Sequence, residues 1–331
     1  ALKVFLVMAE HRLDLKPPLI WRDDEEVTKT RRLNAECPLR ADHWGLNEIW
    51  EKQLKPQLHL IAQPLLSGIT NELEDIHRDY SAWGKGTPGW DPVSFGRSAI
   101  EPSDQDQYPE AVDVLITACR DALEWLVVND PILLDAWLER LGKSEVPIHR
   151  RLAVHAVAAH PQKSADDRLR WLLAHMGLHD SATHHEIYKA VARSYTGALP
   201  ETRSALVETV ISQQLPDNTY GTAAENTARA HFDWLAWLEQ ADPNCPIVQT
   251  ALAPIKSKYS EWKLSERPDF THYVTSGWTG PRSPWTVDEL LSKKPVDQLD
   301  DLLSFKGERF DGPDRSGLIS TLQDACKQNQ A

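Results

Sequence analysis

The sequence lacks any hydrophobic run that approaches the roughly 18 residues needed to span a bilayer, and it has no segment typical of a signal peptide. It is also poor in cysteine. The four cysteines are Cys37, Cys119, Cys245 and Cys326, and none belongs to a Cys-x-x-Cys pair. We therefore expect buried, unpaired thiols in a protein of the reducing cytoplasm.

Positive charge is scarce as well. The 331 residues include 36 Lys and Arg against 49 Asp and Glu, which gives a net charge of −13. Duplex nucleic acid and anionic membranes attract proteins with clustered cations, so neither is expected as the main partner. Two short basic segments, Thr30–Arg32 and Ile148–Arg151, are interpreted as solvated helix faces.

Catalytic signatures are missing too. No Gly-x-x-x-x-Gly-Lys-Ser/Thr loop, Gly-x-Ser-x-Gly elbow or His-Glu-x-x-His pair occurs. The segment Gly84–Gly89 contains Lys85, but Pro88 removes a backbone donor and the flanks are not a strand and a helix, so a turn-rich loop is favoured over a phosphate site. His175, His179, His184 and His185 are close in sequence, but His185-Glu186 is not followed by the second histidine of a His-Glu-x-x-His zinc motif, and capping, core and surface positions are expected for the histidines. We therefore assign no catalytic, cofactor-binding or metal-binding residue.

What the sequence does contain is a succession of short amphipathic helices. From about Pro109 onward, apolar stripes of roughly three turns alternate with Pro, Gly or capping residues. In the clearest stripe, within Ala111–Val128, the apolar positions are Val112, Leu115, Ile116, Cys119, Leu123 and Leu126. The pattern predicts an all-α fold, an irregular α-solenoid of antiparallel helix pairs similar to HEAT or TPR arrays. No strand is expected.

Helix starts carry their own signals. Thr183–Glu186 and Thr286–Glu289 match the capping-box pattern, in which the first and fourth side chains each bind the other's backbone N–H. The last apolar stripe is still running when the chain stops at Ala331. We therefore expect the array to continue beyond the fragment.

Three segments follow from composition: a helical segment 1–81, a loop 82–109 rich in Gly, Pro and aromatic residues, and a helical-repeat array 110–331. A second irregular stretch, 264–284, has a similar composition. Flexible linkers are polar, and long loops in compact chains are often functional. Both stretches are therefore predicted to be ordered loops that lie on the helices.

Three groups of residues carry a family likeness, and they are Trp90–Pro102 with Asp104–Asp106, Arg150–Ala156 with His185–Tyr188, and Gly280–Leu291 with Asp314–Leu318. Together they resemble the helical C-terminal half of large bacterial anti-phage defence proteins of the STAND ATPase type. In that family an effector and a nucleotide-binding module precede a helical sensor region. The resemblance implies that ATPase and effector activities lie outside these residues.

Candidate partner-binding residues lie in the two loops, and they are Trp83, Trp90, Arg97, Trp278 and Arg282. An alternative for Arg97, together with Glu101 and Asp104, is that buried ion pairs and backbone hydrogen bonds pin the first loop to the helices. Trp234 and Trp237 are expected to pack in the core rather than to serve as exposed anchors.

The expected function is therefore non-catalytic recognition of a protein partner. In the context of the resemblance, the partner is a phage structural or packaging protein, and its binding drives homo-oligomerisation of the full-length protein and activation of the effector. Two alternatives remain open: a helical hydrolase or metal-dependent enzyme that uses the histidine-rich region 149–185, and a housekeeping helical-repeat scaffold.

Overall fold

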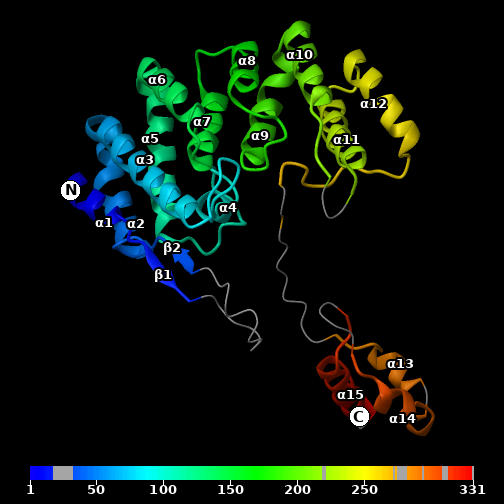
Figure 1. Ribbon diagram of the computed structural model, residues 1–331. Coiled ribbons are helices and arrows are strands. Elements are labelled where there is room, and N and C mark those ends of the chain that lie inside the picture. The colour runs from blue at the N-terminus through cyan, green and yellow to red at the C-terminus, as the bar shows by residue number, and fades with distance from the viewer. Residues whose placement is uncertain are drawn as a thin grey trace. The chain divides into compact units, whose positions relative to one another are not determined.

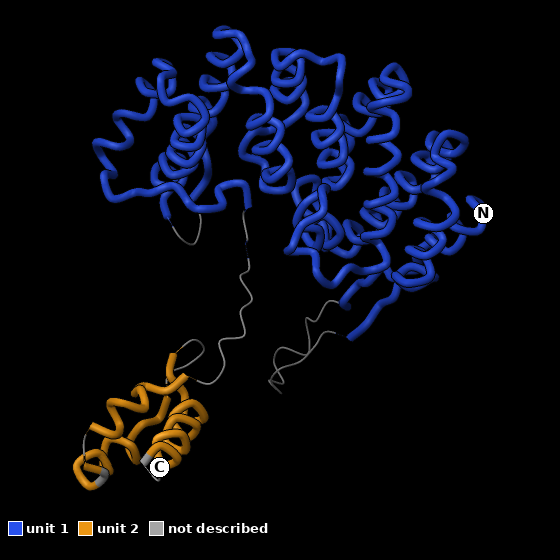
Figure 2. The backbone as a smooth tube through the Cα atoms, turned by 180° about the vertical axis from the view of Figure 1, so that it is seen from behind, with its two compact units in different colours: residues 1–273 blue, residues 274–331 orange. Residues whose placement is uncertain are grey.

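The computed structural model of the chain describes residues 1–17, 33–217, 221–270, 273, 282–292, 294–307 and 312–329. The chain forms two compact units, residues 1–273 and 274–331 (Figure 2). This division falls inside the range 110–331, for which the sequence predicts one continuous array. Each unit is described by itself below.

The first unit is built almost entirely of helices, so the all-α prediction is confirmed. They are α1 (Leu2–Ala9), α2 (His43–Ile49), α3 (Leu58–Ala82), α4 (Pro92–Gly96), α5 (Ala111–Asn129), α6 (Pro131–Gly142), α7 (Pro147–Ala159), α8 (Ala165–His175), α9 (His184–Ser194), α10 (Pro200–Ser212), α11 (Ala223–Ala241) and α12 (Pro246–Lys258). From α5 to α12 they stand side by side in a curved row (Figure 1), and most pack against their neighbours in sequence.

Proline and capping side chains set many of the helix starts. Proline occupies the first turn of α6, α7, α10 and α12, where its missing N–H costs nothing. Ser164 and Thr222 form capping boxes at α8 and α11. The capping box predicted at Thr183–Glu186 is wrong: Thr183 makes no side-chain cap at α9, and its backbone (φ −112°, ψ 7°) lies outside the extended region that capping residues adopt.

One short antiparallel strand pair, β1 (Asp14–Lys16) and β2 (Asn34–Glu36), departs from the expectation of no strand. Each strand has only three residues, too few for an alternating pattern of apolar and polar residues to be recognised, and both sequences are largely polar. Strand β2 is also tied to the loop after α3, because the Lys85 ammonium donates to the side-chain oxygen of Asn34 and to the carbonyl oxygen of Ala35.

The stretch from α2 to α3 is split, as its prolines predict. A π-helical turn (Trp50–Leu54) and a 3₁₀ turn (Lys55–Gln57) separate the two helices, and Pro56 lies in the second turn. Pro64, by contrast, lies inside α3.

A single hydrophobic core runs through the first unit. Within it, helix α5 packs against four other helices, α2, α3, α6 and α7. Its predicted stripe is buried at Leu115, Ile116, Cys119, Leu123 and Leu126. Burial on several sides explains why α5 is also buried at Val114 and Ala118, outside a single narrow face.

The second unit contains α13 (Val287–Leu291), α14 (Pro295–Ser304) and α15 (Arg315–Asn329). Helices α13 and α15 pack together, with Leu290, Leu318 and Ala325 buried. The capping box predicted at Thr286–Glu289 is confirmed at the start of α13. Across the described parts of both units, no helix is long and apolar enough to cross a membrane.

Because α5 packs against four helices, removing one of its buried side chains tests this packing. We expect Leu123→Ala, which removes a fully buried side chain, to lower the free energy of unfolding of the first unit by about 2–5 kcal/mol. Val128→Ala on the same helix is the control, since Val128 is 77% exposed and its change should stay within about 0.5 kcal/mol. Chemical denaturation followed by circular dichroism measures both. Equal effects of the two substitutions would contradict the assigned packing.

Candidate functional site

The loop between α3 and α5 (residues 83–110, hereafter the aromatic loop) lies against the helices (Figure 1). Its short helix α4 is capped by Asp91, whose buried carboxylate accepts a hydrogen bond from the Ser94 N–H at 2.6 Å. The other oxygen of Asp91 lies 2.9 Å from Nδ1 of His77 on α3. Asp91 therefore both caps α4 and ties it to α3.

A buried ion pair anchors the middle of the aromatic loop. Arg151 on α7 and Glu186 on α9 meet through two contacts of 2.9 Å, from Nε to Oε2 and from Nη2 to Oε1. Their side chains are 4% and 1% exposed. Such a bidentate contact matches the fork of the guanidinium to the two carboxylate oxygens. The prediction of a solvated face for Ile148–Arg151 is therefore wrong, since Ile148, His149 and Arg151 are buried; the other basic segment, Thr30–Arg32, lies outside the described residues.

The same pair also forms hydrogen bonds with the loop backbone, and Arg151 and Glu186 with these bonds are called the anchor below. Arg151 donates to three loop carbonyl oxygens, those of Ser94 (2.5 Å), Arg97 (2.5 Å) and Ser98 (3.0 Å). Oε1 of Glu186 accepts a hydrogen bond from the N–H of Ile100 at 3.1 Å. Buried polar groups of the loop thus find their partners in two helices that lie far away in sequence.

Arg97 belongs to this anchor. Its side chain is 6% exposed and donates to the carbonyl oxygen of Ala99 at 2.8 Å and to Asp113 at 3.3 Å, with Asp106 at 3.5 Å. These contacts correspond to the pinning alternative from the sequence, and they leave Arg97 little surface to offer a partner. Asp106 in turn accepts from the N–H of Ser98 at 2.9 Å.

Glu101, also in the aromatic loop, contacts two histidines on α7 and α9. It lies 3.8 Å from Nδ1 of His155 and 3.3 Å from Nε2 of His185, and these contacts hold its pKa well below the usual range. Burial disfavours the charged form of His185, but hydrogen bonds to Asp269 and Glu101 outweigh it and raise the pKa of His185 to about 9. The pKa of His155 is raised in the same way, by Glu101 and Glu124.

The histidine-rich region 149–185 does not gather around one point in the described structure. His149 lies in the core, where burial lowers its pKa to about 3, and His175 stacks on Trp171 with ring centroids 4.4 Å apart. His184 meets the carbonyl oxygen of Pro268 at 2.8 Å. Core packing, ring stacking and a backbone carbonyl contact therefore account for these three side chains.

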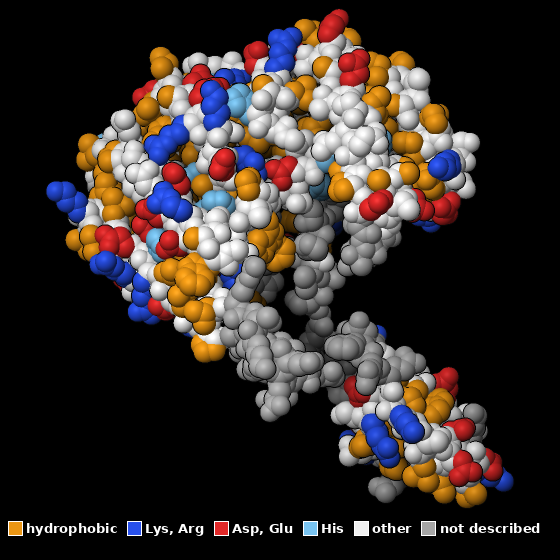
Figure 3. Space-filling view, in the orientation of Figure 1, with side chains coloured by type: hydrophobic (Ala, Val, Ile, Leu, Met, Phe, Trp, Pro, Cys, Tyr) orange, Lys and Arg blue, Asp and Glu red, His pale blue; other side chains and the backbone are white. Residues whose placement is uncertain are grey.

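Aromatic side chains of the loop are exposed. Trp90 and Phe95 are 43% and 61% exposed, with ring centroids 5.9 Å apart, and Tyr108 is 93% exposed. Trp83 is also partly exposed. Figure 3 shows hydrophobic side chains gathered on the face where Figure 1 places α4 and the strand pair.

A groove of about 930 Å³ lies beside the loop, and Tyr108 is the exposed aromatic residue that lines it. One wall is the chain from Asn34 to His43, and the other includes α4, Tyr108 and the start of α5. Its charged lining residues are Glu36, Arg40, Asp42, Lys85, Glu110 and Asp113. The groove, together with Trp90, Phe95 and Tyr108, is called the loop surface below.

The remaining candidates lie elsewhere. Trp278 falls outside the described residues. Arg282 is exposed in the second unit, where its carbonyl oxygen accepts from the Asp314 N–H at 2.8 Å. Trp234 is buried and packs against Tyr188 with ring centroids 4.0 Å apart, as its core assignment predicts. Lys85, in the Gly-rich segment, binds β2.

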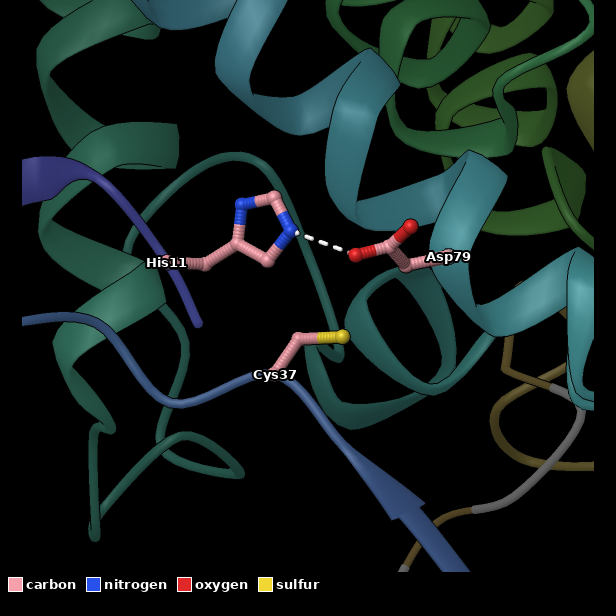
Figure 4. Close-up of side chains that lie close together, drawn as sticks. All are labelled: His11, Cys37 and Asp79. Carbon is pink, nitrogen blue, oxygen red and sulfur yellow. Dashed lines mark hydrogen bonds and ion pairs between the residues drawn. The ribbon is translucent and has the colours of Figure 1, made fainter. Parts of the chain in front are cut away.

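A separate cluster joins three distant segments (Figure 4). His11 follows α1, Cys37 follows β2, and Asp79 lies on α3, and one donor atom of each lies within 4.8 Å of the other two. Nε2 of His11 is 3.0 Å from Asp79, and Glu72 lies 2.5 Å from Nδ1 of the same ring. Burial, followed by the nearby Asp79 charge, raises the pKa of Cys37 to about 11.

The sequence analysis missed this cluster because its members are far apart in the chain and form no spacing motif. The sequence did predict buried thiols, which is confirmed for Cys37, Cys119 and Cys245 and wrong for Cys326, which is exposed near the end of α15. Within the described ranges, no other group of three His, Cys, Asp or Glu side chains brings its donor atoms this close.

Comparison of the chain with protein-family models, with curated proteins and with solved structures found no match. The assignment of function therefore rests on the geometry above and on the residues themselves.

Because Arg151 and Glu186 are buried together, we expect the removal of either side chain to lower the stability of the first unit strongly. Arg151→Ala leaves Glu186 buried without its cation, so we expect the first unit to lose about 3–5 kcal/mol of stability. Arg78→Ala is the control, because Arg78 pairs with Glu74 and Asp75 on the exposed side of α3 and should cost about 1 kcal/mol or less. Denaturant titration measures both variants. A loss for Arg151→Ala as small as that of the control would contradict the anchor.

The raised pKa of His185 predicts a pH dependence. Between about 6.5 and 9 the folded state keeps a proton that the unfolded chain releases, so stability falls as the pH rises through this window, by at most about 1.4 kcal/mol per pH unit for one proton. His185→Asn should flatten that slope, whereas His59→Asn, at an exposed position on α3, should leave it unchanged. Unfolding curves collected from pH 6 to 9 measure the slopes, and identical slopes in wild type and His185→Asn would refute the assignment.

Proposed function

We propose that the chain is a recognition module that binds a protein partner through the loop surface and carries no chemistry of its own. The observation that supports this most directly is the exposure of Trp90, Phe95 and Tyr108 on a loop whose backbone is held by buried ion pairs. Exposed aromatic side chains are the commonest anchors of protein interfaces.

The anchoring of the loop bears on affinity. A mobile loop would lose conformational entropy on binding, and that loss would be subtracted from the interaction energy. Here the backbone from Ser94 to Ile100 is already tied to α7 and α9. Of the three aromatic residues, Phe95 lies in this tied stretch, so a partner would meet its ring close to the bound position.

The shape of the groove suits a partner that inserts an extended or convex segment into it. Its lining contains more acidic than basic side chains, and the chain as a whole carries a net charge of −13. A segment that combines an apolar side chain with Lys or Arg would therefore be complementary to it.

In its wider context we propose that this module is the sensor of a bacterial anti-phage ATPase of the STAND type. The support is the resemblance of Trp90–Pro102, Arg150–Ala156 and Gly280–Leu291 to that family. The partner would be a phage structural or packaging protein, and the ATPase and effector would lie outside residues 1–331. Binding would shift the full-length protein toward an active homo-oligomer.

The proposal is tested with a loop-surface variant, Trp90→Ala/Phe95→Ala. The chain is used to capture proteins from phage-infected cells, and the affinity of each recovered protein is then measured by calorimetry. Loss of two aromatic anchors should weaken binding about 30-fold or more. Ile132→Ala is the matched control, since Ile132 is 85% exposed at the start of α6, outside the loop surface, and should leave the affinity unchanged.

Recovered proteins that bind the loop variant and wild type equally would contradict recognition through the loop surface. Recovery of host proteins alone would contradict the sensor role while leaving the loop surface as a protein-binding site. Circular dichroism of both variants establishes that the changes in affinity do not arise from unfolding.

A further inference from the structure

We propose that His11, Cys37 and Asp79 form a binding site for a transition-metal ion of the zinc class. The three side chains offer an imidazole nitrogen, a sulfur and a carboxylate oxygen. This mixed donor set suits Zn²⁺ and its neighbours such as Co²⁺, whereas Mg²⁺ and Ca²⁺ select oxygen donors alone.

The spacing of the donors fits one ion. With metal–ligand distances of about 2.0–2.3 Å, tetrahedral donors lie roughly 3.3–3.8 Å apart. Here the three donor atoms lie within 4.8 Å of one another, and Nε2 of His11 is 3.0 Å from Asp79. Side-chain adjustments of about 1 Å or less would enclose an ion. Figure 4 shows the imidazole, thiol and carboxylate directed toward a common centre.

Glu72 supplies the second observation. Its carboxylate lies 2.5 Å from Nδ1 of His11 and also accepts the backbone N–H of His11 at 2.7 Å. A carboxylate on Nδ1 fixes the ring and directs the lone pair of Nε2 to a metal, an arrangement that recurs in protein zinc sites. Glu72 is therefore a positioning residue. On binding, the ion takes the place of the protons on Nε2 and on the thiol, which pass to solvent.

Three protein ligands leave one tetrahedral position for water or another donor. Cys37 also lines the groove of the loop surface, so the ion would brace one wall of it by joining the segments after α1 and β2 to α3. The site itself stands on these side chains and does not depend on the proposed function.

The test is a titration of the purified 331-residue chain with Co²⁺, followed by displacement with Zn²⁺. We expect one equivalent of Co²⁺ to produce the near-ultraviolet absorption of a cobalt thiolate, and Zn²⁺ to abolish it. Cys37→Ser should remove the band. Cys326→Ser, at an exposed cysteine in the second unit, should keep it.

Glu72→Gln separates positioning from ligation: the band should persist while the affinity falls about 10–100-fold. His11→Asn provides a second ligand variant and should weaken binding at least as much. Absence of the band in wild type would overturn the proposal, as would its persistence in Cys37→Ser or its loss in Cys326→Ser. These outcomes are independent of whether the loop variant binds a partner.

Discussion

The ion pair between Arg151 and Glu186 is the interaction on which the aromatic loop depends. Burying two charges costs several kcal/mol for each ion, and their attraction offsets this only when the remaining donors and acceptors are also satisfied. In this protein those partners are the carbonyl oxygens of the loop and the N–H of Ile100. The pair and the loop therefore stabilise each other, because neither could remain buried without the other.

This coupling explains how a segment rich in Gly and Pro holds a defined shape. Few of its backbone groups lie in regular secondary structure, so they are satisfied by side chains from α7, α9 and α5. Among the polar side chains of the loop, Arg97 and Asp106 point inward and contact each other. The aromatic side chains of Trp90, Phe95 and Tyr108 are left on the outside, which is the reverse of their usual distribution.

The helical part of the fold could be predicted from the sequence because its signals are local. The stripe of α5 and the capping box at Thr286 involve residues within a few positions of each other. The anchor could not, since Arg151 and Glu186 are polar residues that the sequence alone cannot distinguish from surface charges. Glu186 illustrates this: its spacing from Thr183 suggests a local capping box, but its carboxylate pairs with Arg151, 35 residues away in the sequence. The cluster of His11, Cys37 and Asp79 could not be predicted either, because its members are far apart in the sequence and only the fold brings them together.

The most direct test of this account is amide hydrogen exchange of the isolated chain, followed at the N–H of Ile100. If the loop is held by the buried carboxylate of Glu186, this amide should exchange as slowly as those in the interior of α7, because both require opening of the same packed region. Exchange at the rate of an unstructured peptide would show that the loop moves freely on the helices, and the anchored surface described here would then be wrong.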